Sequence, residues 1–546
     1  LAPGNAGATC ALAEILEELG EAGAALAPLE AALRHQPGSG AAHLALAHAH
    51  WRLGREEEAG DRLRRGVAAA PDDVALREAY LSHCTRRAAQ AVDGGQDPGP
   101  WCRAALEGAA GLPRLTGLLY ERFEILIRLS LLGGHDGLAA ALLAVRSRFD
   151  FPGVAAGETD IFPVSLHDFP DWCAASGLRA EVWTAAAQPV PAAVLQDLPD
   201  YLRPYAEALS SPAAARVGVA LEAEVEVVQG FYVKDNYESF VLAGRRHLLQ
   251  EETELVVAGP AVPLVGVTRG CGTALFRLPR PLYRPVEVAE PCLFLPSTPN
   301  YWHFLVDILP RLLVRDRVPG LADLPVALFD LRGFHYEMLE LAGVPREQIA
   351  DMRARVEPGE VRVLYRFRRA AMPSSVPYPV AYRWLRETFL PRVRGTPGPS
   401  RVYLSRRGAA PKHRIANDAG VASLLAGYGF ETVQPERLGV LETVELVAGA
   451  EIVVAPIGAG TANHVFMPPG CTWVHLANPD FFHAGSNWNR QMGTQSSLVG
   501  RSRRLTGRFP ADPSSLPADP LDRLDVPVEI DLAALDRLVR DILAGA

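Results

Sequence analysis

Residues 451–464, EIVVAPIGAGTANH, decide how the rest of the chain is interpreted. Residues 452–454 form a short apolar run that favours a strand, and a turn with Pro456 and two glycines follows. Residues 461–464 then begin a predicted helix. A helix N-terminus after a glycine turn can bind anionic oxygens, because unpaired backbone N–H groups point outward there and the helix dipole favours negative charge. The alternative is a tight strand-to-helix turn that binds nothing.

Composition and charge restrict the class of protein. The 546 residues predict about three or four domains, and the content of 49% apolar and 21% charged residues is typical of a globular protein. The net charge of −9 argues against a nucleic-acid partner. The sequence contains no uncharged apolar run of about 18 residues, so no membrane span is predicted. The seven cysteines are scattered without a CxxC pair, which favours a reducing compartment and argues against a zinc cluster. We therefore expect a cytoplasmic protein that could act at the inner face of the membrane.

A 34-residue unit occurs twice near the N-terminus. Its helical pattern, with small residues at the helix crossing and proline at the end of each unit, resembles tetratricopeptide repeats. The two copies align Leu12, Ala13, Leu19, Gly20, Ala25, Leu29, Leu33 and Pro37 with Leu46, Ala47, Leu53, Gly54, Ala59, Leu63, Val67 and Pro71. Such repeats could bind a protein partner, although a plain pair of helical hairpins would look the same. We predict a third helix over residues 72–87, a linker over residues 88–115 and a further helix over residues 115–147.

Short strand-like runs broken by glycine and proline fill residues 216–295, and the sequence STPNYWHFLVDILPRLLV follows at residues 297–314. Thr298 can cap a helix whose first residue is Pro299. The period of 3.6 residues per turn determines which side chains share a face of this helix. One face carries His303, Asp307, Arg311 and Val314, and the opposite face carries Leu305, Ile308, Leu309 and Leu312.

His303 and Asp307 are one helical turn apart and can form a hydrogen bond. The carboxylate would fix the imidazole tautomer and raise its basicity, which suits a catalytic base. The alternative is a structural packing contact at the start of the helix.

A second α/β region follows residue 400, in which strands and helices alternate as in a doubly wound sheet. The strand at residues 401–404 ends in Ser-Arg-Arg, so Arg406 and Arg407 could meet phosphate; a solvated loop is the alternative. Arg414 precedes Asn417, which can cap the next helix. His475 is predicted at the carboxyl end of the last strand, where ligands bind in such sheets.

Three stretches together resemble glycosyltransferase family 61, whose bacterial members are often labelled capsular polysaccharide biosynthesis proteins. They are NYWHFLVDILPRLL at 300–313, YLSRRGAAPKHRIAND at 403–418 and AGAEIVVAPIGAGTANHVFMPPGCTWVHL at 448–476. The resemblance covers about residues 216–500 and leaves the helical repeats outside. It implies a GT-B architecture of two Rossmann-like halves that face each other across a cleft. It also implies an inverting transfer from a nucleotide-sugar donor to a glycan acceptor, without a bound metal or other cofactor.

The predicted layout has five parts, with an N-terminal all-α region before the α/β halves. They are helical repeats at 1–90, a linker and helical region at 91–215, an acceptor-side half at 216–395, a donor-side half at 396–500, and a loop with a C-terminal helix at 501–546. The last helix begins at an N-capping Asp531, and its apolar stripe should pack back onto one of the halves.

An inverting transfer needs a base and positive charge for the leaving diphosphate, and these needs give candidate roles to individual residues. His303 or Asp307 is the candidate base and the other would orient it, although His303 could instead contact the donor phosphate. The candidate donor-binding residues are Arg406, Arg407, Gly458, Ala459, Gly460, Thr461, Asn463 and His475. Asn300, Arg311, Arg414 and Asn417 are further candidates.

Two positions depart from the family pattern. Ile457 stands where the family usually has histidine before the glycine turn, and His475 stands where it usually has glutamate. The first departure makes a non-catalytic repeat scaffold with an inactive transferase-like domain the main alternative. A dinucleotide oxidoreductase is a third interpretation, but Asn463 occupies the third glycine position of that fingerprint, and the motif comes late in its domain.

Overall fold

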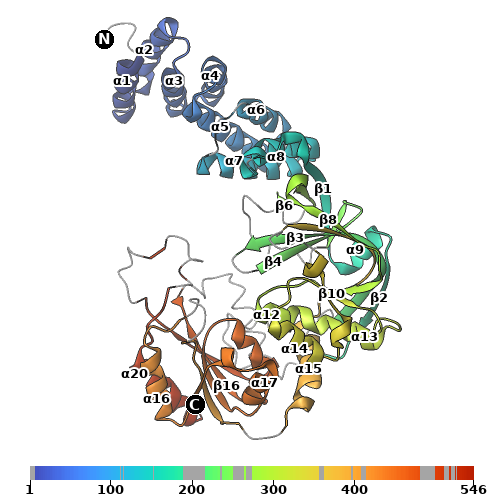
Figure 1. The fold of residues 1–546 in the computed structure, drawn as a ribbon. Helices are drawn as coiled ribbons and strands as arrows, with labels where there is room; N and C mark the ends of the chain where they lie inside the picture. Colours follow the sequence, from blue (N-terminus) through green and yellow to red (C-terminus); the bar gives the residue numbers. More distant parts are fainter. Residues whose placement is uncertain are drawn as a thin grey trace.

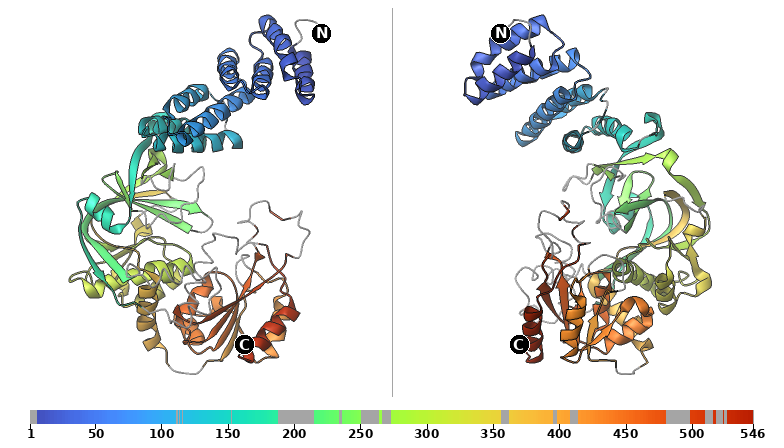
Figure 2. Two further views of the ribbon diagram at one scale, coloured as in Figure 1. Left: turned by 180° about the vertical axis from the view of Figure 1, so that it is seen from behind. Right: turned by 60° about the vertical axis from the view of Figure 1, so that its left-hand side comes forward.

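The computed structural model describes most of the chain. The described residues are 6–187 except 111, 113, 115 and 152, then 215–233, 236–249, 264–265, 273–355, 362–394, 398–407, 414–479, 498–509, 516–517, 523 and 526–545. A helical array comes first, a large mixed sheet with helices follows, and a parallel sheet with its own helices comes last (Figure 1). The array extends away from the two sheets and gives the molecule a curved, elongated outline (Figure 2).

The helical array consists of successive antiparallel hairpins. Its helices are α1 (Ala6–Glu18), α2 (Ala22–His35), α3 (Gly40–Arg52), α4 (Glu56–Ala69), α5 (Val74–Asp93), α6 (Gly99–Ala109), α7 (Gly117–Leu132) and α8 (Asp136–Asp150). The turn after the first helix of each hairpin holds a glycine in the left-handed region that favours this residue: Gly20, Gly54, Gly95 and Gly134, with φ of 79°, 72°, 67° and 73°. The predicted linker at 88–115 is wrong, because the end of α5 and all of α6 lie within it.

The first sheet has twelve described strands in the order β11-β10-β9-β12-β3-β4-β5-β1-β7-β6, with β2 paired to β3 and β8 paired to β12. Its strands are β1 (Thr159–His167), β2 (Arg179–Thr184), β3 (Arg216–Val233), β4 (Asn236–Ala243), β5 (His247–Leu249), β6 (Leu264–Val265), β7 (Thr273–Pro279), β8 (Arg284–Val288), β9 (Cys292–Phe294), β10 (Val326–Leu328), β11 (Ile349–Asp351) and β12 (Val363–Pro373). Because β1 and β2 belong to it, this sheet starts before the expected boundary at residue 216. Within the strand-like stretch predicted over 216–295, residues 250–263 lie outside the described residues.

Only part of the first sheet is Rossmann-like. Strands β11, β10, β9 and β12 are parallel neighbours, whereas β12 pairs antiparallel with the long β3. The described helices between β9 and β12 are α12 (Tyr301–His303), η5 (Phe304–Ile308), η6 (Leu309–Leu313), α13 (Val314–Arg317), α14 (Gly333–Leu341), η7 (Arg346–Gln348) and η8 (Met352–Arg355). The other helices of this region are η1 (Ala156–Glu158), α9 (Phe169–Ala175) and η4 (Arg280–Leu282). The prediction of two Rossmann-like halves therefore needs correction for the first half, where a parallel unit is extended by antiparallel strands.

The helix at 301–317 differs from the regular α-helix that we predicted. Asn300, and not Thr298, is its N-cap, because the Asn300 side chain accepts hydrogen bonds from the backbone N–H groups of Trp302 and His303 at 2.9 and 3.4 Å. After α12 the helix widens into a π-turn, η5, and then tightens into the 3-10 segment η6. Pro310 has no backbone N–H and its ring crowds the preceding turn, which accounts for the change of helix type at this point.

The second sheet is entirely parallel, with the described order β14-β13-β15-β16-β17. Its strands are β13 (Arg401–Leu404), β14 (Glu431–Val433), β15 (Ile452–Pro456), β16 (Thr472–Ala477) and β17 (Arg501–Thr506). Its helices are α16 (Asp418–Ala426), η10 (Pro435–Arg437), α17 (Val440–Ala448), η11 (Ala459–Phe466) and α20 (Leu532–Leu543), and α15 (Tyr378–Phe389) with η9 (Leu390–Arg392) leads into it from β12. None of the helices in the described ranges is both long enough and apolar enough to cross a membrane.

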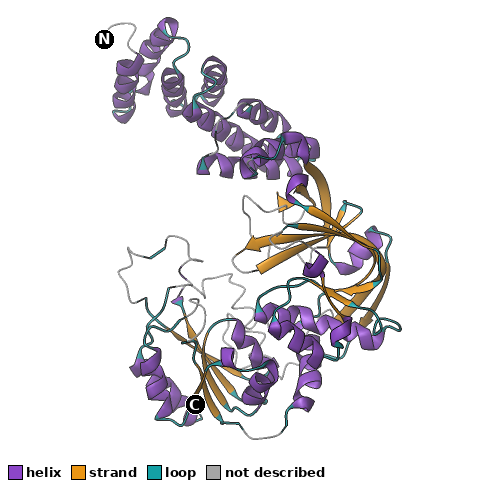
Figure 3. Cartoon of the chain, in the orientation of Figure 1, coloured by secondary structure: helices purple, strands orange, loops and turns teal. Residues whose placement is uncertain are grey.

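The C-terminal helix α20 packs onto the second sheet as predicted (Figure 3). Asp531 caps it by accepting hydrogen bonds from the backbone N–H groups of Ala533 and Ala534 at 2.9 and 3.1 Å. Leu535 and Val539 are its fully buried residues, and they join the apolar core on one face of the sheet. The other face of the sheet shares a continuous core with α15 and with the helices of the first sheet.

Candidate active site

The order of the second sheet locates a binding crevice. Numbered along the chain, its strands lie in the order 2-1-3-4-5, so β13 has β14 on one side and β15 on the other. Chain connections therefore leave β13 in opposite directions, and in open parallel sheets ligands bind outside the carboxyl ends of the strands at such a point. Here that crevice is formed by the ends of β13 and β15.

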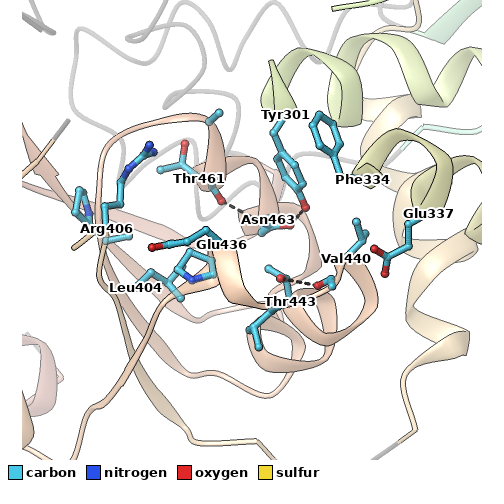
Figure 4. Close-up of a pocket in the computed structure, with 17 residues that line it drawn as sticks. Tyr301, Phe334, Glu337, Leu404, Arg406, Glu436, Val440, Thr443, Thr461 and Asn463 are labelled. Atoms are coloured by element: carbon cyan, nitrogen blue, oxygen red, sulfur yellow. Dashed lines mark hydrogen bonds between the residues drawn. The ribbon is translucent and has the colours of Figure 1, made fainter. Parts of the chain in front are cut away.

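A pocket of about 430 Å³ occupies this crevice. Figure 4 shows that Tyr301, Phe334 and Glu337 from α12 and α14 lie on one side, facing residues of the second sheet's loops and helices. The lining residues are Tyr301, Phe334, Glu337, Leu404, Arg406, Pro435, Glu436, Leu438, Gly439, Val440, Thr443, Ala455, Pro456, Ala459, Gly460, Thr461 and Asn463. Both parts of the α/β region therefore contribute to one pocket.

Arg406 supplies positive charge to the pocket directly after β13. Burial lowers the pKa of its guanidinium, the Glu436 carboxylate opposes that shift, and Arg414 adds to it. The buried Nε of Arg406 has no hydrogen-bond partner among the described residues. Buried donors normally have partners, so an anionic oxygen bound in the pocket would satisfy this one.

The glycine turn is held by its own side chains. The predicted helix is the 3-10 helix η11, in which the Thr461 hydroxyl donates to the Gly458 carbonyl at 2.7 Å and the Asn463 amide to the Gly460 carbonyl at 3.0 Å. The Thr461 N–H also donates to the Gly458 carbonyl, at 3.0 Å, so it is engaged within the turn. The first N–H groups of a helix have no partner inside it, so those of Ala459 and Gly460 are the ones that an anion could reach.

Hydrogen bonds between described residues join the halves of the pocket. The Tyr301 hydroxyl donates a hydrogen bond to Asn463 Oδ1 at 2.8 Å, and burial raises the pKa of this phenol, so it stays protonated. Glu337 of α14 accepts a hydrogen bond from the Leu441 N–H at 3.2 Å, in the first turn of α17, where a helix dipole favours negative charge. Arg386 of α15 also donates to the carbonyls that end η11. The pocket walls are thus fixed relative to each other.

The predicted pair of His303 and Asp307 forms, but it does not line this pocket. His303 Nδ1 lies 2.7 Å from Asp307 Oδ2, and the two side chains are 19% and 30% exposed. His303 follows Tyr301 by two residues, which on a helix is a rotation of about 200°. The pair therefore faces away from the side of α12 that carries Tyr301.

Several other candidates have structural partners outside the pocket. Arg407 and Arg414 are exposed and are not lining residues, whereas Arg311 is buried and donates to the Asp307 carbonyl at 3.0 Å. Asn417 is at the N-cap position of α16 but makes no cap hydrogen bond. Its amide instead pairs with both backbone groups of Ile530, at 2.7 and 3.0 Å, and so holds the C-terminal segment.

His475 is in the middle of β16 and not at its carboxyl end, so the position that we predicted is wrong. It is buried beneath η11, beside Trp473, and does not line the pocket. Burial, with a smaller effect of His464, lowers its pKa to about 3, so the imidazole is neutral. The structure therefore puts His475 in the core that supports the glycine turn.

Sequence reasoning missed much of the pocket lining. Tyr301 stands inside the stretch at 297–314, but it lies outside the polar face that the helical period predicts. The lining residues among 435–440 follow shortly after β14, at the carboxyl end of that strand. This position indicates a place in the binding crevice once β14 is known to lie next to β13. Phe334 and Glu337 come from the other sheet's helices, and no local pattern links them to this site.

No group of three or more His, Cys, Asp or Glu side chains is arranged to hold a metal ion within the described ranges. The fold and pocket define an α/β protein with a pocket at the switch point of a parallel sheet. Residues 301–474 match the family model described as Glycosyltransferase 61, and residues 16–80 match a tetratricopeptide repeat model. The chain thus carries a domain of glycosyltransferase family 61 together with N-terminal tetratricopeptide repeats. All lining residues of the pocket fall within the glycosyltransferase match. No curated protein matches the chain.

Proposed function

We propose that this enzyme transfers a sugar from a nucleotide-sugar donor, bound in the pocket, to a glycan acceptor. The observation that carries the proposal is the pocket at the β13–β15 switch point, with the unsatisfied Nε of Arg406 at its side. The leaving group of such a reaction is a nucleoside diphosphate, and its charge would be stabilised by Arg406 and the N–H groups of Ala459 and Gly460. A GT-B-like arrangement, with the acceptor on the side of α12 and α14, is part of the proposal.

In this reaction the acceptor hydroxyl attacks the anomeric carbon as the bond to the diphosphate oxygen breaks. A base must take the hydroxyl proton, and we assign that role to His303, oriented by Asp307 at 2.7 Å. Attack from the face opposite the leaving group inverts the anomeric configuration. Because His303 does not line the Arg406 pocket, this role requires the acceptor hydroxyl and the anomeric carbon to lie beyond that lining, beside α12.

The alternative of an inactive scaffold rests mainly on Ile457. Ile457 is buried, its backbone N–H pairs with the Leu476 carbonyl at 2.9 Å, and its side chain does not line the pocket. The departure therefore takes no group away from the described lining, and this supports the catalytic proposal.

The proposal also includes the pathway of the reaction and a role for the helical array. Synthesis of a surface or capsular polysaccharide, without a metal, would fit the family resemblance. The helical array would serve to recruit a protein partner, because stacked helical repeats present an extended surface.

A panel of uridine, guanosine and cytidine diphosphate sugars tests the proposed donor. The expected result is saturable binding of one nucleotide class and slow release of its nucleoside diphosphate. No binding across the panel by the folded protein would contradict the proposal.

A further inference from the structure

Glu436 places a carboxylate inside the pocket, and neither the sequence motifs nor the contacts described above explain it. It belongs to η10, directly after β14, and its side chain extends across the middle of the pocket towards Arg406 (Figure 4). The carboxylate is close enough to oppose the lowering of the Arg406 pKa by burial, yet the two described side chains form no ion pair. It is therefore available to a ligand.

A carboxylate in a site for a diphosphate needs a reason, because like charges repel. Ionised carboxylates only accept hydrogen bonds, so any ligand group that Glu436 contacts must be a donor. In a nucleoside diphosphate the donors are the ribose hydroxyls and the N–H groups of the base. The question is which of these lies beside Glu436.

The topology favours the ribose. Strand β14 lies next to β13, so Glu436 and Arg406 leave the sheet at neighbouring strand ends, as do the ribose-binding acidic residue and the phosphate-binding turn of dinucleotide-binding sheets. Figure 4 shows Phe334 and Val440 on the side away from Arg406, near the polar Glu337, and these two apolar side chains suit the faces of a base. Phosphate at Arg406, ribose at Glu436 and base against the apolar wall would follow one another along the pocket.

We infer that Glu436 makes the site specific for ribonucleotides, by accepting hydrogen bonds from the ribose hydroxyls. This inference rests on the proposed function, since it needs a nucleotide in the pocket. It adds a specificity-determining residue that the family motifs did not indicate.

The test compares affinities for uridine, guanosine or cytidine diphosphate, whichever binds, with those for its 2′-deoxy and 3′-deoxy counterparts. Wild-type protein should prefer the ribonucleotide to at least one deoxy form by about tenfold or more, as expected for a hydrogen bond to a charged group. In Glu436→Ala the preference should fall to about one- to twofold, through weaker ribonucleotide binding alone. Glu436→Gln, which keeps the shape but not the charge, should lie between the two.

Glu431→Ala is the matched control, because Glu431 has the same charge, is exposed at the start of β14 and does not line the pocket. It should keep the wild-type preference. An unchanged preference in folded Glu436→Ala would overturn the inference, and so would tighter binding of all the diphosphates at a constant ratio, which would reveal only charge repulsion. If those results came with weakened binding in Arg406→Ala, the proposed function would stand without the inference. If no diphosphate bound to the wild type, both would fail.

Discussion

At the scale of single residues, the structure distinguishes neighbouring side chains whose places relative to the pocket the sequence could not distinguish. Arg406 and Arg407 are adjacent, but only Arg406 lines the pocket, while Arg407 is exposed. The same holds on α12, where Tyr301 faces the pocket and His303 does not. Neighbouring residues of one motif therefore have different expected roles.

His303 is the residue with the sharpest expected effect on chemistry. His303→Ala should lower turnover by about 10²–10⁴-fold, because a positioned base contributes that much, and should leave donor affinity nearly unchanged. Asp307→Asn should cost less, because it removes orientation and charge but keeps the imidazole. Turnover, donor affinity and melting temperature measured on each variant check this.

Other roles for His303 predict other combinations of turnover, donor affinity and melting temperature in His303→Ala. A phosphate contact would lower affinity and turnover together, and a structural role would lower the melting temperature without a specific loss of turnover. Normal turnover in His303→Ala would remove the residue from the catalytic machinery.

Buried His475 makes stability depend on pH in a defined direction. Its pKa is about 3 in the folded chain and 6.5 in the unfolded chain, so below pH 6.5 only the unfolded chain takes up a proton. The free energy of unfolding should fall, as pH drops from 6.5 towards 3, by up to about 1.4 kcal/mol per pH unit for this histidine. Above pH 6.5 it has no such effect.

Denaturant unfolding at pH 7.5 and pH 5 tests this on His475→Phe, whose loss of stability on acidification should be smaller than that of the wild type. His83 and His335, whose pKa values burial lowers to about 4, contribute separately in both proteins. His35→Asn, at an exposed position on α2, serves as the control. Equal pH dependence in His475→Phe and wild type would disprove the assignment.

At the scale of elements, local signals predicted most helices and strands but not their irregularities. The helix before residue 317 was predicted from its apolar period, and Leu305, Ile308, Leu309 and Leu312 are indeed buried. Its π-turn and its Asn300 cap depend on how Pro310 and the Asn300 side chain settle against the rest of the fold. In the third and fourth helical hairpins, α5 matches the helix predicted over 72–87, α6 falls in the stretch predicted as a linker, and α7 and α8 replace the single helix predicted over 115–147, although the turn glycines Gly95 and Gly134 are visible in the sequence.

Asn417, at the start of α16, hydrogen-bonds to the segment before α20. Asn417→Ala should destabilise the second sheet's region by about 1–3 kcal/mol, because it leaves two partly buried backbone groups of Ile530 without partners. Asp531→Ala, which removes only the cap of α20, should cost about 1 kcal/mol and gives the comparison. Chemical denaturation measures both, and a negligible effect of Asn417→Ala would show that the contact contributes nothing.

At the scale of the whole molecule, a buried ionic cluster joins the helical array to the first sheet. Arg277 of β7 is fully buried and donates to Asp150 at the end of α8, and Arg146 Nε lies 3.3 Å from the same carboxylate. Arg146 also pairs with Glu124 at 2.6 Å. One carboxylate thus serves two buried guanidinium groups at the junction.

Asp150→Asn should therefore destabilise the protein by about 3–5 kcal/mol, since it leaves buried positive charge without its partner. Arg128→Ala, which breaks an exposed ion pair with Glu124, should change stability by at most about 1 kcal/mol. Similar effects of the two substitutions on the free energy of unfolding would contradict this account of the junction.

The family, the repeats and the parallel second sheet could be predicted from sequence because each depends on local pattern. The mixed first sheet could not be predicted, since β1 and β2 pair with strands that follow much later in the chain. Most of the pocket could not be predicted for the same reason: Phe334, Glu337 and Glu436 come together only through the packing of α14 and the placement of β14 beside β13.

The central claim, that the switch-point pocket binds the donor through Arg406, is tested most directly by titrating the preferred nucleoside diphosphate into Arg406→Ala and Arg407→Ala. The two variants remove the same charge at adjacent positions, one lining the pocket and one exposed. Arg406→Ala should weaken binding by about tenfold or more, because a charge-assisted contact contributes about 1.5–3 kcal/mol, and Arg407→Ala should bind nearly as the wild type does. Unchanged affinity in folded Arg406→Ala, or equal losses in both variants, would contradict the claim.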